Sequence, residues 1–96
     1  MENDKLFKIA FDFLRKERFY GLYLAYDIGD RLVFFGGNPS EPYYGCRSVS
    51  VDKKNGNCEW FIVETDKENE KMLDEAAEIE IPIKYTYKSE EEILIL

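Results

Sequence analysis

Two turn sequences, each set between alternating apolar residues, constrain the fold of this chain more than any other feature. Asn55-Gly56, within the stretch CRSVSVDKKNGNCEWFIVE, predicts a hairpin at 53–56, because both central positions of a type I′ turn need positive φ. The stretch DIGD predicts a second hairpin at 27–30, since it separates an alternating segment from an apolar run. Two successive hairpins indicate an antiparallel sheet.

The turn at 53–56 also predicts which side chains share a face of the sheet. If the turn has two or four residues, opposed positions sum to an odd number. The core face is then expected to carry Val49, Val51, Cys58, Trp60 and Ile62. The other face is expected to carry Cys46, Ser48, Ser50, Glu59, Phe61 and Val63. Because Cys46 and Cys58 fall on opposite faces, we expect two reduced thiols.

Helical spacing flanks the strand region on both sides. A first helix is expected to begin at the capping residue Asn3 and to end by Gly21, with apolar residues three and four apart at Leu6, Phe7, Ile9, Ala10, Phe13 and Leu14. Thr65 or Asp66 is expected to cap a second helix near 66–78, with Glu68 and Asn69 in its first turn. Its apolar stripe is thin: Met72, Leu73, Ala76 and Ala77.

The remaining segments complete an α+β prediction. GGNPSEP at 36–42 is expected to be a loop, because proline lacks a donor and glycine weakens a strand. Alternation at Ile81, Ile83, Tyr85 and Tyr87 predicts a last strand. We therefore expect a single domain over 1–96, with an antiparallel sheet of four to five strands covered on one face by helices.

Composition argues against several classes of chemistry. The chain has no histidine, the commonest general base and metal ligand, and its two cysteines are too few for a disulfide framework. We therefore expect a protein that is not an enzyme, with no catalytic residues, no metal site and no cofactor. A hydrolase would need loop carboxylates such as Asp27, Asp30 and Glu41 to converge. A small ligand-binding or housekeeping domain would need an apolar pocket between the aromatic sheet face and the loop 36–45.

Hydropathy and charge argue against two kinds of partner, membranes and nucleic acid. No apolar run approaches the roughly 20 residues that span a bilayer, and the start MENDKLFK lacks a signal peptide's basic and apolar regions. We expect a cytoplasmic protein that binds no membrane. Thirteen basic residues against 20 acids also disfavour direct binding to nucleic acid.

The excess negative charge lies in one segment. Residues 64–92 carry 11 acids and 4 bases, whereas the rest of the chain is neutral overall. This segment is either the solvated flank of a helix or a surface that attracts a basic protein partner. On the second interpretation, the partner-binding residues are five acids and two tyrosines that would act as anchors if exposed: Glu68, Glu70, Asp74, Glu75, Glu78, Tyr85 and Tyr87.

The C-terminal stretch ILIL at 93–96 is the other unusual feature. Four apolar residues at a chain end are costly in water, so they should pack internally or pair with another chain. Pairing between two copies of the C-terminal strand would give a homodimer.

Two stretches, YGLYLAYDIGDRLVFFGGNP and SVSVDKKNGNCEWFIV, resemble small immunity proteins of bacterial polymorphic-toxin and contact-dependent growth inhibition systems. The resemblance covers roughly 3–64 and includes Gly37, Asn38 and Pro39 of the first stretch and Asp52, Lys53 and Gly56 of the second. The acidic part after Val63 departs from that pattern. The resemblance implies a cytoplasmic protein that blocks a cognate toxin. Toxins that act on nucleic acid are commonly basic, and an acidic inhibitor would imitate the phosphates they bind.

Overall fold

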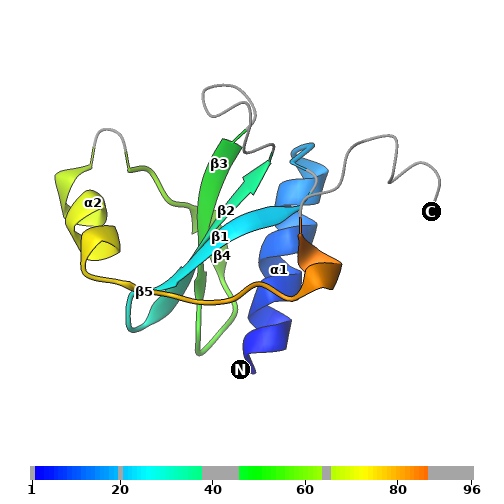
Figure 1. Ribbon diagram of the computed structural model, residues 1–96, viewed down its shortest axis with the longest axis horizontal. Coiled ribbons are helices and arrows are strands. Elements are labelled where there is room, and N and C mark those ends of the chain that lie inside the picture. The colour runs from blue at the N-terminus through cyan, green and yellow to red at the C-terminus, as the bar shows by residue number, and fades with distance from the viewer. Residues whose placement is uncertain (1, 20, 38–45, 64–65, 87–96) are drawn as a thin grey trace.

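Five antiparallel strands form one open sheet, and two helices lie on its opposite sides (Figure 1). The computed structural model describes residues 2–19, 21–37, 46–63 and 66–86. In chain order the elements are α1 (Asn3–Lys16), β1 (Leu22–Asp27), β2 (Arg31–Gly37), β3 (Cys46–Asp52), β4 (Cys58–Trp60), α2 (Lys67–Asp74), β5 (Ala77–Glu78) and the 3₁₀ helix η1 (Ile83–Tyr85). The strand order is β4-β3-β2-β1-β5, which confirms the α+β prediction, although only α1 covers a face of the sheet and α2 does not share that face as expected.

Both predicted hairpins are present. In the first, the side chain of Asp27 accepts a hydrogen bond from the Gly29 N–H at 2.9 Å. In the second, Asp52 pairs across the turn with Asn57, so the loop has the four residues 53–56. The predicted register is confirmed by the pairs Val49↔Trp60 and Val51↔Cys58.

The type of the second turn differs from the prediction. Gly56 has a φ of 75°, but Asn55 does not adopt positive φ, so the turn is not type I′. The Asp52 carboxylate instead accepts the N–H groups of Lys54 and Asn55 at 2.7 and 3.1 Å. The short acidic side chain of Asp52 therefore stabilises the turn through two backbone N–H groups.

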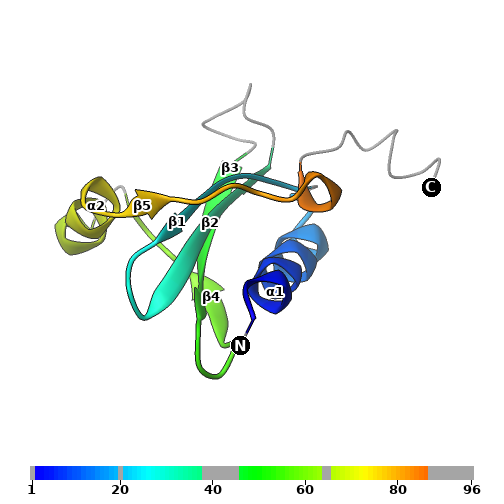
Figure 2. The ribbon, with the colours of Figure 1, turned by 60° about the horizontal axis from the view of Figure 1, so that its bottom comes forward.

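The core lies between α1 and one face of the sheet (Figure 2). The Phe7 ring meets Phe34 of β2 edge-on at 5.2 Å, and Val49 and Val51 are fully buried beneath the helix. Trp60, predicted on this face, contacts Phe13 with its ring at 5.1 Å but keeps 42% of its surface exposed. It is exposed because β4 is an edge strand, with β3 on one side and no second strand beside it among the described residues.

The opposite face of the sheet is also partly buried, which alternation alone did not predict. Phe61 and Ser50 were expected outside the core, yet they are 3% and 0% exposed. The Arg31 guanidinium lies 5.6 Å from the Phe61 ring and donates to the Ser50 hydroxyl at 3.3 Å. Ile62, expected in the core, is 57% exposed, because β4 ends at Trp60.

Gly36 and Gly37 do not belong to a loop as predicted. They extend β2 and pair with Arg47 and Cys46 of β3. Glycine fits position 36 without strain, whereas an added Cβ would lie 2.5 Å from the Leu14 Cδ1 of α1 and force a shift. The missing side chain lets the helix approach the sheet, and this packing outweighs the weak strand propensity of glycine.

The C-terminal part of the described chain differs most from the prediction. Helix α2 ends at Asp74 rather than near 78, because the chain turns there to pair β5 with β1. Residues Ile83–Tyr85 form a 3₁₀ helix in place of the expected last strand. Pro82 precedes it, and a proline has no N–H to offer a ladder. Tyr87 and the stretch 93–96 lie outside the described residues, so the homodimer prediction concerns a part that is not described.

The start of α1 differs slightly from the prediction. The residue before the helix is Glu2 rather than Asn3, and no side chain caps this end. Neither α-helix in the described ranges has the length and apolar composition needed to cross a membrane.

Candidate functional site

The acidic part of the structure begins with α2, which local sequence signals position. Asp66 caps the helix, as predicted, by accepting the N–H groups of Glu68 and Asn69 at 3.0 and 3.1 Å. The Asn69 side-chain amide donates to the Ile62 carbonyl at 2.7 Å and joins the helix to the chain that follows β4. No residue of α2 is buried, so the helix adds little to the core.

The predicted partner-binding acids of this helix are all exposed: Glu68, Glu70, Asp74 and Glu75. Glu70 and Asp74 are four positions apart and share one side of the helix, whereas Glu68 and Glu75 share another. Glu78 follows in β5, is also exposed, and pairs through its backbone with Tyr26. All five acids are therefore open to solvent, and those of α2 lie on two sides of the helix rather than on one.

Among the described residues, ion pairs are found outside the segment 66–80 and not within it. Every ion pair found among them lies outside 66–80: Lys8–Asp12, Arg31–Asp30, Arg31–Glu59, Lys53–Asp27 and Lys84–Asp4. The segment 66–80 holds seven acids and two lysines. Its carboxylates are thus neither buried nor paired within the described ranges, and their field extends into solvent.

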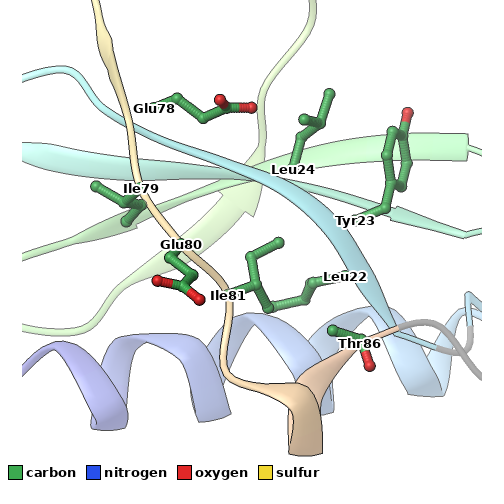
Figure 3. Close-up of a pocket in the computed structure, with 8 residues that line it drawn as sticks. All are labelled: Leu22, Tyr23, Leu24, Glu78, Ile79, Glu80, Ile81 and Thr86. Carbon is green, nitrogen blue, oxygen red and sulfur yellow. The ribbon is translucent and has the colours of Figure 1, made fainter.

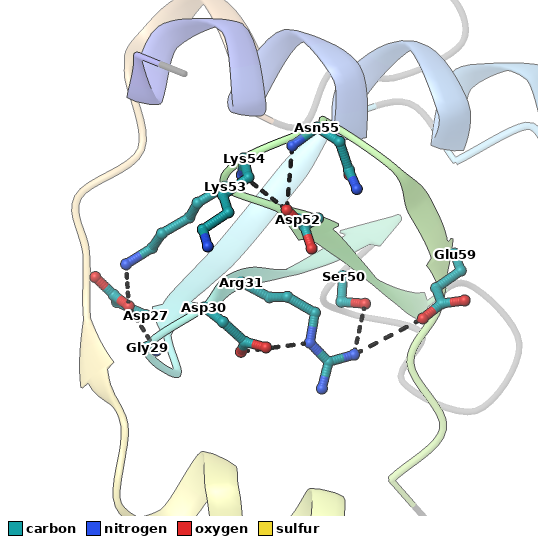
Figure 4. A network of polar contacts seen from close by, with 10 residues as sticks. All are labelled: Asp27, Gly29, Asp30, Arg31, Ser50, Asp52, Lys53, Lys54, Asn55 and Glu59. Carbon is teal, nitrogen blue, oxygen red and sulfur yellow. Dashed lines mark hydrogen bonds and ion pairs between the residues drawn. The ribbon is translucent and has the colours of Figure 1, made fainter.

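A second polar cluster joins the two hairpin turns (Figure 4). Lys53 Nζ lies 2.8 Å from Asp27 Oδ1, and the Lys53 N–H donates to the Asp30 carbonyl at 3.1 Å. The hydrogen bond from Lys53, followed by that from Gly29, lowers the pKa of Asp27 below its usual range. The hydrolase alternative required Asp27 and Asp30 to converge with Glu41. Asp27 is instead engaged in holding the turns, and Glu41 lies outside the described residues.

A groove runs along the outer edge of β1 (Figure 3). It has a volume of about 630 Å³ and is lined by Leu22, Tyr23, Leu24, Glu78, Ile79, Glu80, Ile81 and Thr86. The partly exposed side chains of Leu24, Ile79 and Ile81 give it an apolar floor above the fully buried Leu22, and Glu78 and Glu80 are exposed at its rim. The acidic segment 66–80 therefore ends beside an apolar groove.

Sequence reasoning missed this groove, although part of it was visible in the pattern. The alternation of acids and isoleucines in EIEIPI, residues 78–83, indicates a segment with one acidic and one apolar side. What the pattern did not reveal is that the segment leaves the edge of β1 after Ile79.

The two predicted tyrosine anchors have different outcomes. Tyr85 is only 8% exposed, with its ring stacked on Phe7 at 6.0 Å and tilted against Phe11 at 5.6 Å. The exposure that an anchor needs is absent, so Tyr85 is a core residue. Its hydroxyl lies 3.4 Å from the Asp4 carboxylate. Tyr87 lies outside the described residues.

The aromatic pocket of the ligand-binding alternative is only partly covered by the described chain. The face under α1 is filled by the buried side chains of the core. On the other face, the Phe35 ring contacts those of Tyr23 and Tyr26 at 6.2 and 6.0 Å. The loop residues 38–45, which were expected to close this pocket, lie outside the described ranges.

No protein-family model matches this chain, and neither a curated protein nor a solved structure matches it significantly.

Proposed function

We propose that this chain is a non-enzymatic binding protein that docks a basic protein partner through the acidic surface, defined here as Glu68, Glu70, Asp74, Glu75 and Glu78. One observation carries the proposal: these carboxylates are exposed and make no ion pair within the described ranges, whereas five acids elsewhere, Asp4, Asp12, Asp27, Asp30 and Glu59, are paired. Unpaired charges of one sign attract an oppositely charged surface and speed the encounter.

The contrast with the rest of the molecule supports a role in recognition rather than in stability. Lys53–Asp27 connects two turns, and Lys84–Asp4 connects the C-terminal part of the described chain to α1. The acids of α2 have no such task, since none is buried and the helix contributes no core residue. Their removal should therefore change binding more than folding.

Within this class, we propose an immunity protein that neutralises a cognate bacterial toxin, basic and directed at nucleic acid. The resemblance of 3–64 to small immunity proteins supports this narrower proposal. The negative surface agrees with it, because exposed carboxylates compete with phosphates for the lysines and arginines of such a toxin.

The test uses the product of the neighbouring reading frame, since immunity proteins are encoded beside their toxins. The purified neighbour and this chain are mixed at rising ionic strength, and the association rate is measured by stopped flow. We expect the rate to fall at least tenfold between about 10 mM and 500 mM salt, because screening removes long-range attraction. An unchanged rate would refute docking through the acidic surface.

Matched variants locate the effect. The fourfold variant Glu68→Gln, Glu70→Gln, Asp74→Asn, Glu75→Gln should slow association and flatten its salt dependence. The control removes acids outside the segment, Glu2→Gln and Glu17→Gln, and should leave both nearly as in the wild type. If both variants slowed association equally per charge removed, the rate would depend only on the net charge of the protein, and docking through the acidic surface would be refuted.

A further inference from the structure

The groove at the edge of β1 arises from a break in strand pairing. β5 pairs with β1 at Tyr26↔Glu78 and Asp27↔Ala77, and the Ile79 N–H still donates to the Ala25 carbonyl at 2.9 Å. Beyond that point the chain leaves the edge and forms η1. It returns only at Thr86, which bridges to Leu22 in the parallel sense.

The break leaves a space of strand-like dimensions. It is lined by Leu22, Tyr23 and Leu24 of β1, and a strand advances about 3.3 Å per residue, so two or three residues of an extended chain match its length. Its floor offers apolar side chains that are already ordered by the core, because Ile79 and Ile81 pack against the main cluster. A pre-formed apolar groove lowers the ordering cost of binding.

The charges at the groove select its occupant. Glu78 and Glu80 are exposed at the rim, and α2 adds further negative charge just before them. The nearest lysine that follows, Lys84, is held at 3.0 Å by Asp4 of α1. An apolar segment flanked by lysine or arginine therefore complements both floor and rim, whereas an acidic segment would be repelled.

We infer that the groove binds an extended segment of the basic partner, in which apolar side chains enter between β1 and the 79–81 segment and lysine or arginine side chains meet Glu78 and Glu80. This inference rests on the proposed function and adds where the partner's chain lies. Sheet edges commonly receive extended peptides in this manner.

Three peptides test the inference with the intact chain: KVKVK, its acidic counterpart EVEVE, and KSKSK, which keeps the charge and removes the apolar side chains. Binding is followed by ¹³C-methyl NMR at 0.15 M salt. KVKVK should shift the methyl signals of Leu24, Ile79 and Ile81. KSKSK should bind about tenfold more weakly, because valine burial is lost, and EVEVE should cause no shift. Equal binding of KVKVK and KSKSK, or shifts confined to α2, would overturn the inference.

A pair of variants with equal charge change gives the control. Glu78→Gln with Glu80→Gln should weaken KVKVK binding about threefold to tenfold, since two exposed ion pairs are lost. Glu70→Gln with Asp74→Asn, on α2, should weaken it less than twofold, because screening at 0.15 M salt acts over about 8 Å. The reverse order would place the peptide on α2 instead of in the groove.

The two proposals can fail separately. If the neighbouring protein associates in a salt-dependent manner but KVKVK leaves the groove methyl signals unchanged, the groove inference is wrong and the docking surface stands. If KVKVK fills the groove but no salt-dependent association with a basic protein occurs, the proposed function is wrong.

Discussion

Arg18 occupies a backbone position that usually belongs to glycine. It has a φ of 68°, and the flanking bonds, Phe19 N–H to Leu14 carbonyl at 2.8 Å and Arg18 N–H to Arg15 carbonyl at 3.0 Å, form a Schellman motif that ends α1. A left-handed residue with a Cβ costs about 1 kcal/mol. Arg18→Gly should therefore raise the free energy of unfolding by about 0.5–1 kcal/mol, as measured by urea denaturation. Arg18→Ala keeps the Cβ, so an equal gain from it would contradict this explanation.

Gly36 allows α1 to lie close to the sheet. Its added Cβ would be 2.5 Å from Leu14 Cδ1 and 3.1 Å from the Gly21 carbonyl oxygen. Leu14 is fully buried and cannot turn into solvent. We expect Gly36→Ala to lower the free energy of unfolding by about 1–3 kcal/mol, measured by urea denaturation.

A double-mutant cycle checks the cause of that loss. Leu14→Ala removes the side chain that the new methyl group would strike. In this background Gly36→Ala should cost at least about 1 kcal/mol less than in the wild type. The same cost in both backgrounds would place the clash elsewhere.

Cys58 is a free thiol whose reactivity should be low. Burial, with a smaller contribution from the Glu59 carboxylate, raises the pKa of the Cys58 thiol to about 11 from a usual value of 9.0. The thiolate is the reactive form, so its share at pH 8 should be about 100-fold smaller than in an unfolded peptide. The rate of reaction with a disulfide reagent, compared in native buffer and in urea, tests this. A variant Cys46→Ser isolates the signal, and similar rates would contradict the shifted pKa.

At the level of elements, α2 should be able to unfold locally. Its cap, Asp66, contributes about 0.5–2 kcal/mol to such a helix, yet no residue of α2 is buried. Asp66→Ala should speed amide hydrogen exchange at Glu70 and Lys71, whereas the global melting temperature should change by less than about 2 °C. A large fall in the melting temperature would show that α2 supports the core.

Elements with strong local signals were predicted correctly from the sequence, and elements decided by distant contacts were not. The turn at 53–56 and the Asp66 cap depend on a few neighbouring residues, and both were found. Gly36 was assigned to a loop because its role depends on Leu14, which lies 22 positions earlier. Tyr85 alternates as a strand residue would, but it is buried in contact with Phe7 and Phe11 of α1.

In the candidate site, too, features with a local sequence signal were predicted and a feature that depends on distant contacts was not. The acids of α2 were singled out from the charge distribution alone, and the structure shows that their side chains are exposed; whether they bind a partner stays a prediction. The groove was missed, because it exists only where the segment after Ile79 separates from β1. That separation goes with the packing of Tyr85, a residue of η1, against α1. A contact between residues so far apart in the chain cannot be predicted from a local sequence pattern.

Among the residues that the structure describes, the turn carboxylates and the acids of α2 differ in their bonding. Asp27 and Asp52 accept hydrogen bonds that hold the hairpin turns, and together they stabilise the end of the sheet where both turns meet (Figure 4). The acids of the acidic surface have no such bonds in the described ranges. Acidification should therefore weaken the scaffold through a few carboxylates, not in proportion to the total number of acids.

The direction of this pH dependence follows from the lowered pKa values of the two turn carboxylates. Hydrogen bonds from Lys53 and Gly29 lower that of Asp27, and those from the Lys54 and Asn55 N–H groups lower that of Asp52, both from 3.8. The unfolded chain then takes up protons before the folded chain does. The stability these groups provide is complete above pH 3.8 and is lost as the pH falls through the folded pKa values.

Asparagine at both positions keeps an acceptor oxygen but cannot take up a proton in this range. The double variant Asp27→Asn, Asp52→Asn should be less stable than the wild type at pH 7, and this difference should shrink at pH 2.5, as measured by urea denaturation at both values. Glu70→Gln with Asp74→Asn removes the same charge from α2, where no ion pair is formed within the described residues. That control should follow the wild type at both pH values. If the control lost the same pH dependence, repulsion among all the acids would govern acid stability, because the location of a carboxylate would then make no difference.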